Sequence, residues 1–129
     1  MKRRIGVPLI AAVLLIASAH AQGPQIDRRV LERVDLPTPG YEAVLIEGNM
    51  PIGGREGRHT HPGVLVGYVQ SGTLTLEHQD RPPTVYRAGE SFQVEPETIH
   101  EGINTGDTPV VVIAAFIVQK GKPLTTQVD

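Results

Sequence analysis

The chain has 129 residues, which is enough for one domain and too few for two domains of ordinary size. It contains no cysteine, which excludes disulfide bonds and a lipid-modified cysteine. Its formal net charge of −2 argues against nucleic acid and anionic membranes as partners.

The first twenty-one residues have the pattern of a cleavable signal peptide. Basic residues at 2–4 precede an apolar stretch at 5–17, and Ala19-His20-Ala21 has the small-x-small form of a cleavage site. The apolar stretch is shorter than the roughly 20 residues that cross a bilayer, which disfavours an uncleaved anchor. We therefore expect a signal peptide at 1–21, a periplasmic or secreted location, and a mature chain that is not attached to the membrane. Its nine basic and fourteen acidic residues would give the mature chain a net charge of −5.

The remainder, residues 22–129, predicts one all-β domain of about eight to ten short strands, with turn residues every 8–12 positions. We expect strands at residues 28–36 (or a short helix there), 41–47, 64–70, 73–77, 84–87, 91–95, 98–102 and 110–118. No convincing amphipathic helix interrupts them. The pattern is typical of a sandwich or barrel and favours a jelly roll.

Three of these segments carry more specific predictions. Residues 64–70 and 73–77 flank Ser71-Gly72, a two-residue gap that predicts a β-hairpin. Residues 110–118 are apolar throughout, which predicts a strand buried on both faces. Residues 120–129 are expected to form a polar tail.

His59 and His61 lie two residues apart, after a glycine-rich segment and before a strand. In an extended chain such residues point to one face, roughly 6.5–7 Å apart, so both imidazoles can bind one ion. His100 follows a strand and a proline turn, and it could supply a third nitrogen from a neighbouring strand. A single strand histidine is usually structural, but the three together predict a metal site at His59, His61 and His100. Imidazole suits Zn, Fe, Cu, Ni or Mn, so the sequence leaves the metal open.

These segments resemble the two motifs of the cupin superfamily. Matching positions are Gly53, His59, His61 and Gly72 in the first motif, and Gly89, His100 and Asn104 in the second. The similarity covers residues 28–124 and is to small single-domain cupins of the conserved-barrel type. It implies a double-stranded β-helix, or jelly-roll barrel, built from a pair of six-stranded sheets with a divalent metal (Fe, Mn, Ni or Zn) in its mouth.

The sequence departs from the family pattern at two places. The first motif has a glutamate that should fall at Leu65 or Val66, and neither residue can bind a metal. By strand alternation from His61, Leu65 faces inward. In the second motif Glu95-Pro96-Glu97 stands where Pro-x-Gly is expected, so we predict a stiffer or differently shaped corner.

The missing carboxylate leaves three possibilities open. Three neutral histidines can hold a metal alone, and the site then keeps the full positive charge of the ion and favours anionic ligands. Alternatively, Glu56 or Glu101, the acidic residues nearest the histidines in sequence, supplies the oxygen ligand. Thirdly, the barrel has lost its metal and kept only a pocket.

Three functions follow from these possibilities: a metal-dependent oxygenase, decarboxylase or isomerase acting on a small anionic substrate, a non-catalytic small-ligand-binding module, or a degenerate barrel. No residue is assigned a catalytic role, and no organic cofactor is expected. The segment 30–36 is an unpaired edge strand in this reading, which suggests a homodimer.

The other polar and aromatic residues near the motifs have mainly structural interpretations. We expect His78 at the surface, Phe92 in the core, Asn104 in a turn, and Tyr68 in either the core or the pocket. Arg55 and Arg58 flank the first motif, where they are either solvated or hold an anionic substrate.

Overall fold

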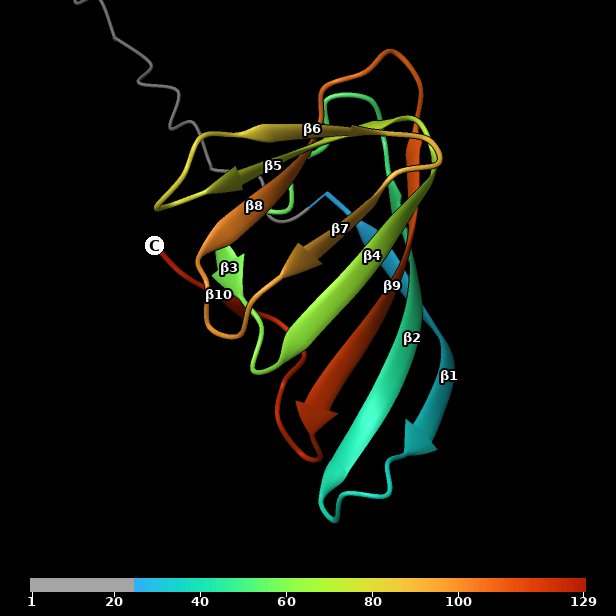
Figure 1. Cartoon of the computed structure of the whole chain (residues 1–129). Coiled ribbons are helices and arrows are strands. Elements are labelled where there is room, and N and C mark those ends of the chain that lie inside the picture. The colour runs from blue at the N-terminus through green and yellow to red at the C-terminus, as the bar shows by residue number, and fades with distance from the viewer. Residues whose placement is uncertain (1–24) are drawn as a thin grey trace, which may run out of the picture.

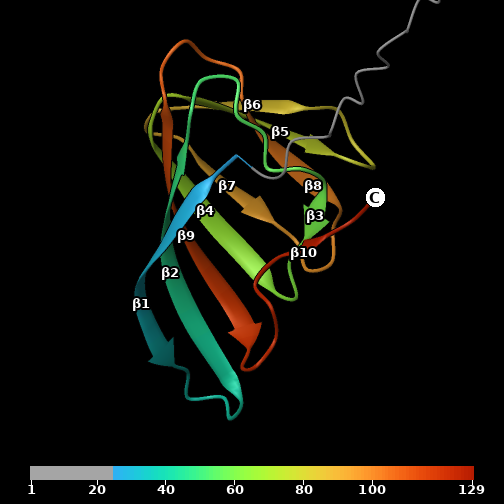
Figure 2. The same cartoon turned by 180° about the vertical axis from the view of Figure 1, so that it is seen from behind.

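The computed structural model describes residues 25–129, so the predicted signal peptide lies outside the described part of the chain. Ten strands form two five-stranded antiparallel sheets that lie face to face (Figures 1 and 2). The first sheet has the order β1 (Asp27–Asp35), β2 (Tyr41–Met50), β9 (Val110–Gln119), β4 (Val64–Ser71) and β7 (Ser91–Val94). The second has the order β10 (Thr126–Gln127), β3 (His59–Thr60), β8 (His100–Asn104), β5 (Thr73–His78) and β6 (Thr84–Arg87).

This architecture confirms the predicted all-β jelly roll, although the described sheets have five strands each and not six. Among the described residues, no helix is long and apolar enough to cross a membrane. Figure 1 shows that the long strands β2 and β9 of the first sheet extend beyond the second sheet, whose strands are shorter.

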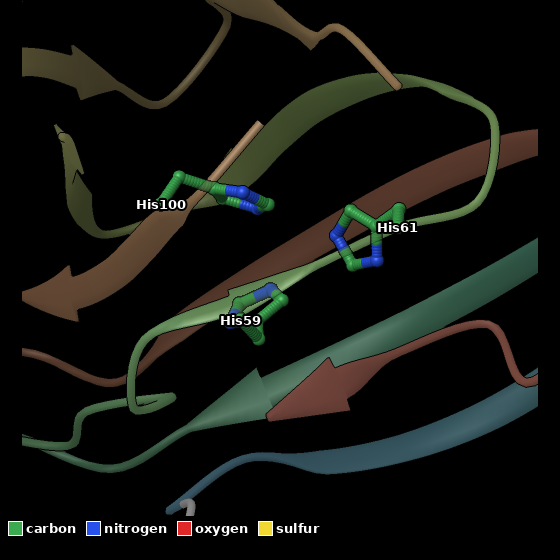
Figure 3. A group of neighbouring side chains, drawn as sticks. All are labelled: His59, His61 and His100. Atoms are coloured by element: carbon green, nitrogen blue, oxygen red, sulfur yellow. The ribbon is translucent and has the colours of Figure 1, made fainter. Parts of the chain in front are cut away.

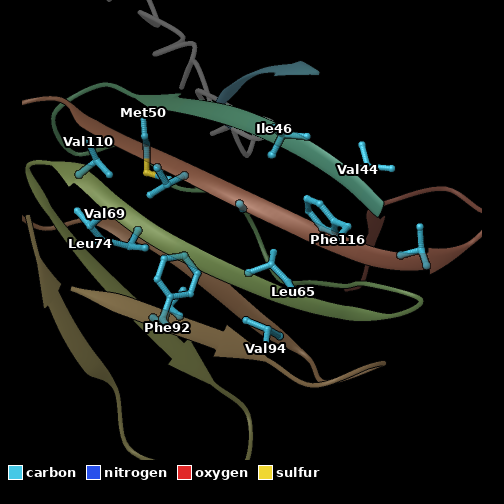
Figure 4. Packing of buried hydrophobic residues seen from close by; sticks show 14 residues of the cluster. Val44, Ile46, Met50, Leu65, Val69, Leu74, Phe92, Val94, Val110 and Phe116 are labelled. Atoms are coloured by element: carbon cyan, nitrogen blue, oxygen red, sulfur yellow. The ribbon is translucent and has the colours of Figure 1, made fainter. Parts of the chain in front are cut away.

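The core fills the space between the sheets and consists mainly of aliphatic side chains (Figure 4). In β4 the inward residues Leu65 and Val69 are buried, whereas Val66 and Tyr68 are about half exposed on the outer face. Phe92 packs in the core, as predicted, and Leu65 faces inward, as strand alternation required. The first sheet therefore has one buried face and one face that the described residues leave uncovered.

That uncovered face explains an error in the prediction for β9, which was expected to be buried on both faces. Its residues alternate: Phe116 is buried at 2% exposure, whereas Ile117 is 38% exposed. No second layer packs on the outer side of this sheet within residues 25–129. A continuous apolar run was therefore not sufficient evidence for burial of both faces.

The predicted hairpin around Gly72 was also wrong. β4 pairs with β7 and β9, whereas β5 pairs with β6 and β8, so the chain crosses from one sheet to the other at this point. Gly72 has a φ of +82°, and a Cβ at this residue would lie 2.6 Å from the carbonyl oxygen of Pro109. Glycine is therefore required at a tight corner between the sheets, and a two-residue gap looks the same there as in a hairpin.

The C-terminal segment is not a free polar tail as predicted. Its short strand β10 pairs with β3, with Gln127 opposite His59. Two polar residues show no hydrophobic periodicity, so this strand gave no signal in the sequence. The pairing holds the preceding segment, including Leu124, against the histidines.

The corner before β8 has a left-handed backbone conformation, although Glu97 occupies the position where the second motif has glycine. Glu97 has a φ of 57°, and it is the one residue other than glycine with a positive φ in the described part of the chain. Its N–H donates a hydrogen bond to the carbonyl oxygen of His61 at 2.8 Å. This bond joins the corner to the histidine segment and supports the strained conformation.

Candidate metal centre

The three predicted histidines meet at one point between the two sheets. His59 on β3 is opposite His100 on β8 in the strand register, and His61 follows β3 directly. Figure 3 shows the three rings turned toward one another. Their ring centroids lie 4.3–4.9 Å apart. One nitrogen from each ring lies within 4.8 Å of the others, and each residue is at most 3% exposed. The three histidines could therefore hold one metal ion together.

Backbone carbonyl groups select the same tautomer in all three rings. The Nδ1 atoms of His59, His61 and His100 lie 2.8, 2.7 and 2.9 Å from the carbonyl oxygens of Gly57, Leu124 and Thr98, respectively. Because a carbonyl oxygen only accepts, each Nδ1 must carry the hydrogen and donate it. Each Nε2 then has a free lone pair, which is the arrangement of a metal-binding histidine with its outer hydrogen bond in place.

His59 gives the clearest evidence that an ion fits here. Its Nε2 atom is buried and has no hydrogen-bond partner among the described residues. A buried polar atom without a partner costs roughly 1–3 kcal/mol, and such atoms are rare in folded proteins. A metal ion bound by the three Nε2 atoms would satisfy this one, so the donor set fits a divalent transition metal.

The protonation of the site also suits metal binding. Burial lowers the pKa of His61 to about 3, with smaller lowering contributions from His59, His100 and Arg28 against a raising hydrogen bond to Leu124. Burial likewise lowers the pKa of His100 to about 4, and the neighbouring His59 adds to this effect. Both rings are therefore neutral at pH 7, which is the form that binds a metal.

The histidines open onto a pocket inside the barrel. It is narrow, and His61 and His100 form part of its wall. Most of the remaining wall is aliphatic, with Leu65 among the lining residues. The polar lining residues other than the histidines are Arg28 and Glu56. A small molecule with an apolar part and an anionic group would match this lining.

Of the two acidic residues proposed to replace the missing carboxylate, only Glu56 lies at the site. Glu56 Oε2 is 3.9 Å from His59 Nε2. Glu101 instead accepts two hydrogen bonds from Arg55, at 2.9 and 2.8 Å, and one from the Gly57 N–H at 3.2 Å. It does not line the pocket, because successive residues of β8 point to opposite faces.

The arginine beside the pocket is one that sequence analysis missed. Arg28 on β1 donates from Nη2 to Glu56 Oε1 at 2.9 Å. Arg55 and Arg58 face away from the pocket: Arg55 binds Glu101, and Arg58 donates to Gln79 Oε1 at 2.9 Å. No signal identified Arg28 in the sequence, because it lies about thirty residues before the histidines on a strand of another sheet.

His78 is closer to the site than predicted. It is half-buried, lies opposite His100 in the register of β5 and β8, and stacks on that ring with centroids 6.0 Å apart. It is not one of the residues whose ligand atoms converge. Asn104 has the predicted turn role: its Nδ2 atom lies 2.9 Å from the carbonyl oxygens of Pro51 and Thr108.

Comparison with solved structures gives cupin folds. A cupin-like protein from Thermotoga maritima matches with a TM-score of 0.66 and 16% identity, over 80% of this chain and 75% of that protein. An oxalate oxidase in complex with the substrate analogue glycolate matches with a TM-score of 0.64 and 20% identity. That match covers 84% of this chain and 57% of the oxidase. The polyketide cyclase RemF from Streptomyces resistomycificus matches with a TM-score of 0.64 and 18% identity, over 84% and 77% of the respective chains.

Identities this low establish a shared fold and not a shared activity. No curated protein matches the sequence. The family model of the cupin domain, however, matches residues 47–118, which is more than half of the 129 residues and includes all three histidines. The sequence match, the two-sheet barrel and the histidine cluster agree, and the chain belongs to the cupin family.

Proposed function

We propose that this chain is an exported cupin that binds one divalent transition metal through His59, His61 and His100 and uses it on a small anionic molecule. The observation that carries the proposal is the shared tautomer of the three rings. Each Nδ1 is held by a backbone carbonyl group, which leaves three Nε2 lone pairs directed at one buried point. A purely structural histidine cluster has no need of this arrangement.

The donor set narrows the metal to a class. Neutral imidazoles favour Fe, Mn, Ni or Zn in a chain without cysteine. When bound, such an ion supplies Lewis-acid polarisation or a centre for oxygen activation. Because imidazole carries no charge, the three histidines do not reduce the positive charge of the ion, and a divalent ion stays net positive even with one carboxylate ligand. This charge favours carboxylates, enolates and similar anions as ligands.

The protein itself would select and shield the bound molecule. The aliphatic wall that includes Leu65 and Val94 removes water from the reacting atoms and accommodates an apolar group. Arg28 lies in the same lining, where its side chain is paired with Glu56, so the metal ion supplies the positive charge for an anionic molecule. Small carboxylic acids are therefore the substrate class that we propose, with dioxygenation, decarboxylation and isomerisation as the candidate reactions. The oxalate oxidase with the same fold was solved with glycolate, a molecule of this class.

One observation favours a second function, that of a non-catalytic carrier or sensor. Apart from His61 and His100, the polar residues of the described pocket lining are Arg28 and Glu56, and these two pair with each other. Among the residues that the structure describes, no other acid or base lines the pocket to move a proton. A ligand could therefore be bound at the metal without being converted.

The two functions are separated by one experiment on the metal-loaded protein. A panel of small carboxylic acids, including oxalate and glycolate, is screened for ligand-induced thermal shifts, oxygen uptake and product formation by mass spectrometry. Turnover that is lost in His100→Ala supports the enzyme, whereas metal-dependent binding without turnover supports the carrier. If no acid binds or reacts in a metal-dependent way, the proposed substrate class is wrong. Export is tested by fractionating cells that express the full chain.

A further inference from the structure

We propose that Glu56 is a fourth protein ligand of the metal and replaces the carboxylate that is missing at Leu65. The inference rests on the proposed metal binding by the three histidines. It assigns the oxygen donor to the segment before β3, so the carboxylate would approach the ion from a different element than β4.

The β4 side of the pocket cannot provide an oxygen ligand. Leu65 is 6% exposed, lines the pocket, and is opposite Phe116 and Val94 in the strand register. Its outward neighbour Val66 faces away from the pocket. An oxygen ligand from the protein must therefore come from elsewhere in the lining, and the one carboxylate there among the described residues is Glu56.

The distance between Glu56 and His59 suits a shared ion. Two ligand atoms that each lie about 2.0–2.2 Å from one ion are separated by roughly 3 Å at a right angle and by at most about 4.2–4.3 Å. Glu56 Oε2 lies 3.9 Å from His59 Nε2, within this range. Glu56 is not one of the residues whose ligand atoms all lie within 4.8 Å of one another, so its carboxylate must turn toward His61 and His100 when an ion binds. The Nδ1 of His59 donates to Gly57, so its Nε2 presents a lone pair to a carboxylate oxygen. Two acceptors that face each other in a buried place are stabilised by a cation between them.

Two further groups hold the Glu56 carboxylate in this orientation. Arg28 donates to Oε1 at 2.9 Å, and the backbone N–H of Gly102 donates to Oε2 at 3.0 Å. Each carboxylate oxygen has two lone pairs, so Oε2 keeps one that is not used by Gly102. Partners of this kind orient a ligating carboxylate, and here they hold it beside His59. Arg28 and Gly102 come from β1 and β8, so both sheets contribute to the position of Glu56.

Gly102 offers a way to move the carboxylate without removing its charge. A Cβ added at Gly102 would overlap Glu56 Oε2, which is the movable end of a side chain. Gly102→Ala would therefore displace the carboxylate and leave the histidines in place. Glu56→Gln is the complementary change, since it keeps the shape and removes the charge.

The test measures metal affinity on purified, metal-free protein by competition with a chelator, using Zn²⁺ and Mn²⁺ as probes. We expect Glu56→Gln and Gly102→Ala each to weaken binding by about 10- to 100-fold, the range seen even for outer-sphere partners of a ligand. Glu77→Gln is the control: it makes the same charge change at an exposed side chain on β5, and it should alter the affinity less than about twofold. Circular dichroism and melting temperature verify that each variant is folded.

Two outcomes would overturn the inference in different ways. If Glu56→Gln and Gly102→Ala bind as tightly as the unmodified protein while His100→Ala does not bind, Glu56 is not a ligand and the three-histidine function stands. If His100→Ala also binds with unchanged affinity, the metal does not bind at the histidines and the proposed function fails as well.

Discussion

Acidification of the metal-free protein tests the buried, neutral state of the histidines. Burial lowers the pKa of His61 to about 3 and that of His100 to about 4, whereas both would titrate near 6.5 in the unfolded chain. Between pH 6.5 and pH 4 the unfolded state therefore binds more protons than the folded state, and stability falls as the pH falls. Above pH 6.5 both states are neutral, and this contribution is constant.

The size of the effect follows from the pKa difference. Each pH unit below 6.5 costs about 1.4 kcal/mol per histidine while the folded form stays neutral, so pH 5 costs about 2 kcal/mol for each ring. The two rings together destabilise the protein by about 4 kcal/mol, a large share of the roughly 5–15 kcal/mol of a typical domain. Burial also lowers the pKa of His78, and that residue contributes in the same direction.

The assay is urea unfolding in the presence of a chelator at pH 7.5, 6.5, 5.5 and 5.0, with the free energy of unfolding extrapolated to water. Because His100→Gln removes one of the two titrating rings, it should reduce the loss to about half. His78→Gln, measured in parallel, isolates the contribution of that ring. A loss below about 1 kcal/mol between pH 7.5 and pH 5 would show that the histidines are not held neutral by burial, and it would refute the reasoning.

Three further changes have defined outcomes. Glu97→Gly relieves the strain of the left-handed conformation at φ 57° and should raise the free energy of unfolding by about 1 kcal/mol. A lower free energy of unfolding, measured with urea, would show that Glu97 is not strained. Gly63→Ala places a Cβ against the carbonyl oxygen of Ile117 and should cost about 1–3 kcal/mol in the same assay, so an unchanged stability would show that the close approach is not real. The β1 edge, where Val34 is 55% exposed, should form a homodimer detectable by sedimentation at micromolar concentration and weakened by Val34→Lys, whereas a monomer throughout would exclude it.

Much of the fold could be predicted because short strands with turn residues between them leave a local signal. The strands that contain residues 41–47, 84–87 and 110–118 were found near their observed bounds. Their assignment to sheets could not be found in the same way. Gly72 separates two strands in a pattern that fits both a hairpin and a crossing between sheets, and only contacts distant in sequence decide between them.

The site, like the fold, could be predicted where its residues are close in sequence and not where they come from distant segments. The three histidines were predicted from their spacing, and Leu65 was placed on the inward face by strand alternation. Some of the groups that orient the histidines and Glu56 are local in sequence, such as the carbonyl groups of Gly57 and Thr98, but others come from β1 and from the C-terminal segment. Neither Arg28 nor the carbonyl group of Leu124 belongs to a recognisable sequence motif. Arg28 is an ordinary charged residue on an edge strand, and Leu124 acts through its backbone.

The metal content of the purified protein tests the central claim most directly. The full chain is expressed in medium that contains Fe, Mn, Ni and Zn, and the purified product is assayed by elemental analysis beside His59→Ala, His61→Ala and His100→Ala. We predict close to one equivalent of a single transition metal in the unmodified protein and less than about a tenth of an equivalent in each variant, because removal of one ligand leaves an incomplete site. Less than about a tenth of an equivalent in the unmodified protein, or equal metal content in all four proteins, would contradict a metal centre at the three histidines.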